Sequence, residues 1–321
     1  MVILQKIVKR STSNKKQKKV IRLLLSSFMV VMVFSYASCN AQSNLRLSVG
    51  TQLHFSEIEL KSSEFESSNR GGAGILVGIS KGLDETWSLH SGVGLNYYRN
   101  RHAIKNYSGT QETTDMSGEA FEFRYTSNKF SEKQKLTAMT IPLAVQYESF
   151  GTVRLYSKLG VEANLFIAEE SDSKTANLKT AGFFPRINAV LNGPKFAGFG
   201  NYSKKEFNED DLNVKNSYNA VIELGVKQIY PSGSAFYAGG FFKYGINNIS
   251  SKGGSSGLVS FDTDSPTNFR SSSVLNALEN PQDGAKRISN EANFHVFGIV
   301  LRYEFDLQFS KPNVDEADAE S

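Results

Sequence analysis

Several stretches alternate apolar with other residues, and nine charged side chains fall on their non-apolar positions. These charged side chains have the greatest potential for chemistry. They are Arg46, Arg154, Lys158, Glu162, Glu223, Lys227, Lys243, Arg302 and Glu304. Acids and bases that lie together away from water must pair, because an isolated buried charge is costly. The set therefore predicts either an ion-pair network that fills an interior or the lining of a narrow polar conduit.

Other candidates for catalysis or metal binding are weak. His90 adjoins Ser91, as in lipid hydrolases that pair the two, but adjacent strand residues point to opposite faces. An acidic cluster could offer oxygen ligands to Ca²⁺, but its spacing fits no standard calcium loop and two lysines adjoin it, so a solvated loop is favoured. The cluster comprises Glu206, Glu209, Asp210 and Asp211. We expect no catalytic residue, no cofactor and no metal.

The elements that position the charges are strands. Eight segments alternate apolar and polar residues, and no segment after residue 41 sustains the spacing of an amphipathic helix. The segments cover residues 44–55, 72–82, 86–98, 137–148, 152–167, 217–229, 234–248 and 293–307. No charged residue occurs on the apolar faces of these segments. A lipid-facing surface requires this exclusion, since Lys or Arg at the bilayer midplane costs ~2–4 kcal/mol.

Strands that cross lipid must close into a barrel, because unpaired backbone groups are too costly there. The sequence thus predicts an all-β fold, an eight-stranded antiparallel transmembrane β-barrel whose lumen is filled by side chains. Its connections alternate in length, which predicts short periplasmic turns and four long external loops. The turns are 83–86, 149–151 and 230–233, and the loops are 56–71, 99–136, 168–216 and 249–292.

Aromatic residues lie near the strand ends on the apolar faces, as in the aromatic girdles of membrane barrels. We expect Trp87, Tyr147, Phe236 and Phe305 near the periplasmic interface, and Tyr97 and Tyr218 near the outer one.

Residues 1–41 have the organisation of a secretory signal peptide. They hold eight Lys/Arg and no Asp/Glu, with a basic part, a short apolar run at 23–34 and small residues before Gln42. Cleavage before Cys39, which would leave a lipoprotein, is an alternative, although Tyr36 stands where Leu is usual. The remainder holds 28 basic and 32 acidic residues, which removes any whole-chain case for binding nucleic acid.

Several motifs resemble the small outer-membrane β-barrel proteins of Bacteroidota, often called PorT-like. They are Ile141-Pro142-Leu143, Gln146-Tyr147, Tyr156-Ser157-Lys158-Leu159-Gly160, and the Ala41-Gln42 junction. The last strand also resembles the carboxy-terminal signal that the barrel-assembly machinery reads, through Gly298, Leu301, Tyr303 and Phe305. The resemblance implies a fold and a location, but no catalytic residues. The loops after the fifth and seventh strands depart from the family pattern.

We therefore expect a signal peptide (1–41), an outer-membrane barrel (42–309) and a disordered acidic periplasmic tail (310–321). The favoured function is a non-enzymatic structural or interaction role through the external loops, with a protein or glycan partner. The alternatives are a narrow pore or a transport or secretion-system accessory component, and then a lipid-modifying enzyme. Expected contacts also include outer-membrane lipid and, during insertion, the assembly machinery.

Overall fold

The computed structural model describes residues 45–61, 65–209, 212–251, 256–279 and 287–306. The chain divides into two units, Met1–Leu45 and Arg46–Ser321, and the second unit contains every described residue except Leu45. The predicted signal peptide and acidic tail lie outside the described residues. No described helix has the length and apolar character needed to span a bilayer.

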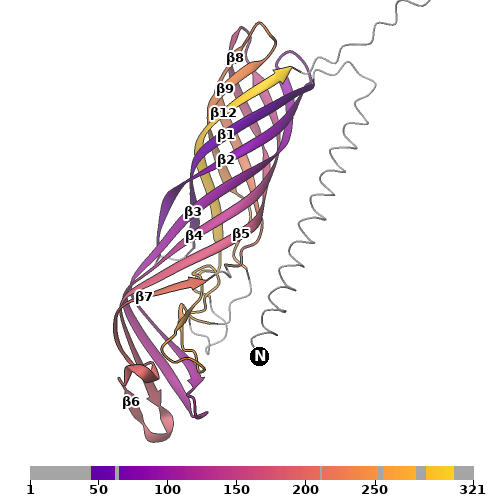
Figure 1. Ribbon diagram of the computed structural model, residues 1–321. Coiled ribbons are helices and arrows are strands. Elements are labelled where there is room, and N and C mark those ends of the chain that lie inside the picture. Colours follow the sequence, from indigo (N-terminus) through magenta and orange to yellow (C-terminus); the bar gives the residue numbers. More distant parts are fainter. Residues whose placement is uncertain (1–44, 62–64, 210–211, 252–255, 280–286, 307–321) are drawn as a thin grey trace, which may run out of the picture. The chain divides into compact units, whose positions relative to one another are not determined.

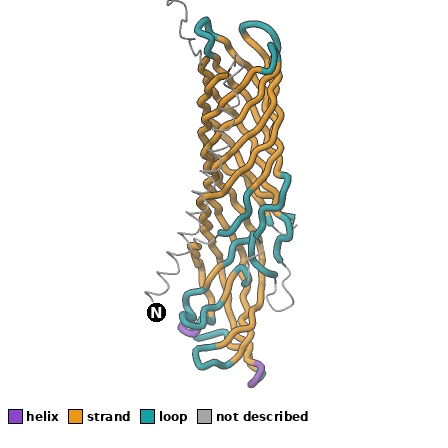
Figure 2. Tube along the Cα trace, turned by 90° about the vertical axis from the view of Figure 1, so that its right-hand side faces the viewer, coloured by secondary structure: helices purple, strands orange, loops and turns teal. Residues whose placement is uncertain are grey.

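Eight strands close into a ring, which confirms the predicted all-β, antiparallel barrel (Figure 1). In ring order they are β1 (Leu45–Leu60), β2 (Glu66–Gly82), β3 (Trp87–Thr114), β4 (Ala120–Glu148), β5 (Val153–Phe184), β8 (Ser217–Ile229), β9 (Ala235–Gly245) and β12 (Ala292–Asp306). β12 pairs with β1 and completes the closure. The strands run obliquely around the barrel, as Figure 2 shows.

The remaining elements are short and do not belong to the closed ring of eight strands. β6 (Ala189–Leu191) and β7 (Gly200–Glu209) both pair with β5. β10 (Val259–Ser260) and β11 (Arg270–Ser271) form a separate two-stranded sheet. Two 3₁₀ turns, η1 (Pro185–Ile187) and η2 (Lys195–Ala197), flank β6.

Three tight turns join strands at one end of the barrel, which we call the turn end; the opposite end is the distal end. Asp84 Oδ1 accepts the backbone N–H groups of Thr86 and Trp87, each at 2.7 Å, and so fixes the first turn. Gly151 and Gly233 adopt positive φ values of 113° and 80° in the other two, a conformation that glycine reaches without a Cβ penalty. The short turns are therefore encoded locally.

Strands β3, β4 and β5 run well past the segments expected from the sequence, to 28, 29 and 32 residues. The predicted loop at 99–136 is therefore mostly a long hairpin, since Thr114 pairs with Ala120. Alternation continues in these extensions, but their outward faces become polar. The apolar pattern marks where lipid ends, not where the strands end.

Pro142 lies in the middle of β4, and its pairing differs on its two sides. Towards β5 the ladder is continuous, with Pro142 opposite Glu162. Towards β3 the pairs Ser91–Leu143 and Gly94–Thr140 share one register, but the residues between them are unpaired. The ladder gap lies beside the residue that has no N–H to donate. The Ser91 hydroxyl donates to the Pro142 carbonyl oxygen at 3.0 Å across this gap.

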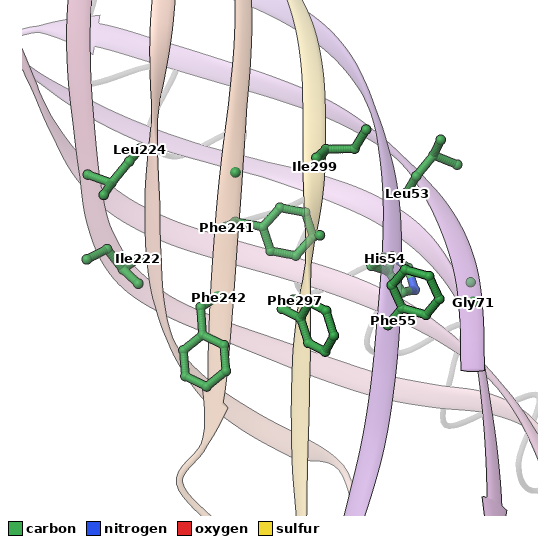
Figure 3. A pocket seen from close by; sticks show the side chains of 13 residues that line it. Leu53, His54, Phe55, Gly71, Ile222, Leu224, Phe241, Phe242, Phe297 and Ile299 are labelled. Atoms are coloured by element: carbon green, nitrogen blue, oxygen red, sulfur yellow. The ribbon is translucent and has the colours of Figure 1, made fainter. Parts of the chain in front are cut away.

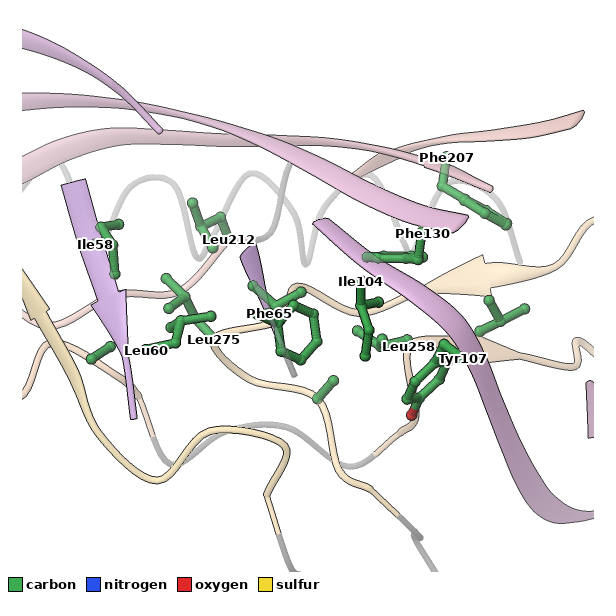
Figure 4. Packing of buried hydrophobic residues seen from close by; sticks show 14 of the residues in the cluster. Ile58, Leu60, Phe65, Ile104, Tyr107, Phe130, Phe207, Leu212, Leu258 and Leu275 are labelled. Atoms are coloured by element: carbon green, nitrogen blue, oxygen red, sulfur yellow. The ribbon is translucent and has the colours of Figure 1, made fainter. Parts of the chain in front are cut away.

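A hydrophobic cluster fills the distal end of the barrel (Figure 4). The inward faces of the extended strands supply Ile58, Ile104, Phe130 and Phe294, and the segment between β9 and β12 supplies Leu258, Val274 and Leu275. All of these side chains are buried. The interior therefore has two zones, a polar zone towards the turn end and an apolar core at the distal end.

Candidate functional site

The outward face of the ring is an apolar belt. Leu155 is 68% exposed, Ile75 63% and Leu159 61%, and their neighbours along each strand point inward. Val161 and Leu301 also point outward, at 53% and 43%, rather than converging on an interior. A water-soluble barrel would bury these side chains, whereas a bilayer takes them up without cost.

The fold is a transmembrane β-barrel.

Comparison with known proteins gave no matching family model and no matching curated protein. Among solved structures, OprG from Pseudomonas aeruginosa is similar, with 11% identity over 82% of this chain and 96% of that chain and a TM-score of 0.33. Ail of Yersinia pestis shows 9% identity over 81% of this chain and 98% of that chain, with a TM-score of 0.29. Neisserial surface protein A shows 10% identity over 80% of this chain and 95% of that chain, with a TM-score of 0.28.

The lumen contains the charged residues identified from the sequence, arranged in three groups. The group nearest the turn end centres on Lys227, which is buried. Its Nζ lies 2.9 Å from Glu148 Oε1 and 3.7 Å from Glu304 Oε1. Arg46 pairs with Glu304 at 3.1 Å, and Arg154 pairs with Glu148 at 3.3 Å. Arg46 and Arg154 are the more exposed members, so this group reaches the solvent at the turn end.

The second group centres on Glu223. Its carboxylate accepts from Lys158 Nζ at 3.2 Å and from the Tyr156 hydroxyl at 2.9 Å. Arg302 lies 3.8 Å from the same oxygen and donates to Gln146 Oε1 at 3.0 Å. Its guanidinium also lies 4.1 Å from the centroid of the Tyr237 ring. This cation therefore has an anion, an amide and an aromatic face as partners, which is how a buried charge is tolerated.

The third group is a single pair, Lys243 with Glu162. Lys243 Nζ lies 2.9 Å from each carboxylate oxygen and 3.1 Å from Gln52 Oε1. Above it, the Tyr98 hydroxyl donates to Asn164 Oδ1 at 3.2 Å, and the Tyr98 ring packs edge-on against Phe294. This layer is the border between the polar lumen and the apolar distal core.

Glu148 is the member of the network that the strand pattern did not identify. It follows the last outward residue of β4, Tyr147, so its alternation phase places it inside with Gln146. The signal was available at the last residue of the strand expected at 137–148, next to the turn expected at 149–151. Tyr156 and Tyr237 were also missed, since a tyrosine on an inward face resembles ordinary filling.

Inward glycines make room for the lumen rings. A Cβ on Gly225 would lie 2.8 Å from the Tyr156 ring and closer still to the Ala238 carbonyl. A Cβ on Gly239 would meet the Tyr156 hydroxyl. These two glycines therefore form the surface on which Tyr156 lies.

The predicted girdle residues are exposed near the two rims of the belt. Trp87, Tyr147, Phe236 and Phe305 lie next to the turn end, and Tyr97 and Tyr218 lie towards the distal end. Trp87 and Tyr147 are cross-strand partners with ring centroids 5.1 Å apart. In the last strand, Leu301, Tyr303 and Phe305 face outward, while Gly298 lies against the backbone of His54.

The candidate catalytic and metal-binding groups do not assemble into a site. His90 Nε2 contacts the Ser88 hydroxyl at 2.9 Å, whereas Ser91 bonds to Pro142, so His90 and Ser91 diverge. Glu206 pairs with Lys174 and Lys204, and Asp210 and Asp211 lie outside the described residues. Within the described ranges no group of three His, Cys, Asp or Glu could hold a metal ion.

A buried carboxylate fastens the segment between β9 and β12 inside the distal end. Glu132 on β4 is fully buried and accepts from the Ser273 hydroxyl at 2.6 Å and the Val274 N–H at 2.7 Å. Gln134 and Ser171 donate to it at 2.7 and 2.9 Å. Burial raises the pKa of the Glu132 carboxyl. Sequence reasoning did not identify this residue.

The far end of the extended sheet carries an exposed apolar group, which we call the tip patch. It consists of Met116, Ile187, Val190, Leu191 and Phe196. Phe196 is 79% exposed, whereas Phe184 and Phe199 are buried and pack around Phe121. Between the end of β5 and the start of β7, Phe184 and Phe199 thus pack against the sheet, whereas Phe196 faces solvent.

Proposed function

We propose that this protein resides in a bacterial outer membrane as a sealed, non-enzymatic barrel that presents its extended distal sheet to a protein partner. The turn end faces the periplasm and the distal end faces the exterior, since membrane barrels have short turns inside and long connections outside. The PorT-like resemblance and a predicted signal peptide agree with this location.

The observation that carries the proposal is the closed lumen. Three groups of ion pairs and hydrogen bonds fill the polar zone, and Lys227, Lys243 and Arg302 each lie against an anion. Beyond them, Phe294 and Leu275 belong to a buried apolar cluster. Eight strands enclose only enough space for side chains. An ion could cross the barrel only if the ion pairs of the polar zone and the packing of the apolar core were both disrupted.

The tip patch is the surface that a partner would contact. Monomeric proteins rarely leave large apolar groups together in water without use, and aromatic residues, Met and Arg are enriched at protein interfaces. Arg186 pairs with Glu119 at 2.7 and 3.1 Å and joins η1 to the β3–β4 turn. This ion pair therefore fixes the segment that carries the tip patch before any partner binds.

Membrane location and closure are tested on the purified full-length protein. We expect it to fractionate with the outer membrane, to migrate faster on gels before boiling than after, and to give no steady current in planar bilayers. A stable ohmic conductance would favour the narrow-pore alternative instead. Recovery in the soluble fraction would contradict the membrane assignment.

The partner surface is tested by photo-crosslinking on intact cells. A photoreactive phenylalanine derivative at position 196 should give a discrete protein adduct that excess unlabelled protein suppresses and that Ile187→Ser abolishes. Asn201→Ser, on the outward side of β7, is the matched control and should leave the adduct unchanged. An adduct that persists in Ile187→Ser, or no adduct at all, would rule out the tip patch as the contact surface.

A further inference from the structure

A ladder of like charges stands on the outward face of the β3–β4 hairpin. Cross-strand partners are Arg99 with Lys135, Arg101 with Lys133, and Lys105 with Lys129. Like charges directly opposite each other destabilise a sheet. The first two pairs are consecutive on this face, and the uncharged pair Ala103–Ser131 separates them from the third. Such pairs need negative charge beside them.

Ion pairs with acidic neighbours form only at the two ends of this ladder; Asp172 is the β5 register partner of Lys133, but its carboxylate pairs with Lys135. Lys105 pairs with Glu66 at 2.8 Å, and Lys135 pairs with Glu170 and Asp172 at 3.3 and 3.0 Å. Among the described residues, no ion pair is formed by Arg101 or Lys133, in the middle of the ladder. The central pair is therefore the position left for an external anion.

The ladder begins where the lipid belt ends. Arg99 and Lys135 are two residues beyond Tyr97 and Thr137, the pair at the distal rim. Strands rise about 3.3 Å per residue, so on strands tilted by about 45° the first two pairs lie roughly 5 and 9 Å above the rim. The headgroup layer on each side of a bilayer is about 5–8 Å thick. Arg99 and Lys135 therefore lie within the headgroup layer, and Arg101 and Lys133 lie at its outer edge, within reach of lipid phosphates.

An apolar groove runs across the belt to the foot of the ladder (Figure 3). It has a volume of about 860 Å³ and crosses from β8 to β2, with Leu224, Phe242, Ile299 and Leu53 along it. Gly240 leaves space at its middle, since a Cβ there would meet nothing nearer than 3.8 Å. The groove ends at Gly71, whose carbonyl accepts from Arg99 Nε at 2.6 Å.

We propose that this surface binds a phosphorylated lipid of the outer leaflet, with an acyl chain in the groove and a phosphate between Arg101 and Lys133. Arg99 connects the groove with the ladder, because it is a member of the ladder and donates a hydrogen bond to the Gly71 carbonyl at the end of the groove. The inference rests on the membrane location proposed above. Its ligand is a lipid rather than a free anion, since the groove and the ladder are continuous.

The test is native mass spectrometry of the full-length protein with bisphosphorylated lipid A, the same lipid after phosphatase treatment, and inorganic phosphate. We expect the phosphorylated lipid to bind and the other two to bind far more weakly. The double variant Arg101→Gln/Lys133→Gln should lose about 30-fold in affinity, from about fivefold per cation at a lipid surface. Gly240→Leu, which fills the groove, should weaken binding of the lipid.

The matched control is Lys174→Gln/Lys204→Gln, which removes two cations from the same sheet. These lysines pair with Glu206 on the β5–β7 side, so lipid affinity should stay within about twofold. Equal binding of phosphorylated and dephosphorylated lipid would overturn the phosphate site. Tight binding of inorganic phosphate, unaffected by Gly240→Leu, would overturn the lipid assignment.

Gel migration with and without boiling, run on every variant, separates the two proposals. A folded barrel in the outer membrane that binds no lipid A contradicts only the lipid site. Recovery of the protein in the soluble fraction contradicts the membrane location on which the lipid site depends.

Discussion

Lys227 Nζ on β8 donates to both carboxylate oxygens of Glu148 at the end of β4, each at 2.9 Å, across 79 residues of sequence. Glu148 also accepts from Arg154, and Lys227 lies near Glu304. The pair therefore joins two strands that are not neighbours in the ring and holds together the turn-end group of the lumen.

Removing one partner of this pair should cost more than removing both. Lys227→Met leaves the Glu148 carboxylate short of its main cation, and we expect a loss of about 3–5 kcal/mol in the free energy of unfolding. Glu148→Gln/Lys227→Met should recover part of that loss. Urea unfolding in detergent micelles, followed by gel migration, measures the cycle; strictly additive losses would show that the two side chains act independently.

His102 should make the distal core sensitive to acid. Burial lowers the pKa of its imidazole from 6.5 to about 4, so the folded protein favours the neutral ring. Stability from this group is complete above pH 6.5 and declines as pH falls towards 4, by at most about 3 kcal/mol.

Glu132, the cross-strand partner of His102, acts in the opposite sense. Its raised pKa means that the folded state favours the protonated acid, so its contribution declines as pH rises above the ordinary value of 4.5. His102→Gln should therefore flatten the loss of stability between pH 6.5 and 4. Unfolding midpoints across this range test the expectation, and an unchanged acid slope in the variant would refute it.

Glu132→Gln should loosen the segment between β9 and β12. The carboxylate accepts four hydrogen bonds, three at Oε1 and the Val274 N–H at Oε2, so an amide in its place turns its NH2 group towards the donors of one oxygen. We expect faster hydrogen exchange at Val274, by about tenfold or more, with strands of the belt unaffected. Lys133→Gln, the outward neighbour, serves as control. Equal protection in wild type and Glu132→Gln would contradict the fastening role.

Gly225→Ala should destabilise the barrel, whereas Gly240→Ala should not. The new methyl at 225 would overlap the Ala238 carbonyl and the Tyr156 ring, but at 240 it points into open space. We expect a loss of about 1–3 kcal/mol for the first variant and under about 0.5 kcal/mol for the second. The fraction of heat-modifiable protein at increasing urea compares them. Matching curves would show that close packing at Gly225 is unimportant.

The sequence by itself determined which side of each strand meets lipid. In β1, Leu53 and His54 fall on opposite faces because the strand period is two, and the exclusion of charge selects the outer face. The turns at Asp84 and Gly233 could also be predicted from the sequence, because their hydrogen bonds join residues only three positions apart. This information is local, so a single sequence contains it.

The tertiary structure alone decided the partners and the extent of the strands. Which anion meets Lys227 depends on a register set across the ring, and Glu132 reaches Ser273 over 141 residues. Thr114 and Ala120 pair as part of a hairpin whose outward face is polar, so no lipid pattern marked it. The pairing of distant side chains and the packing of the distal core depend on cross-strand geometry, which alternation along one strand does not specify.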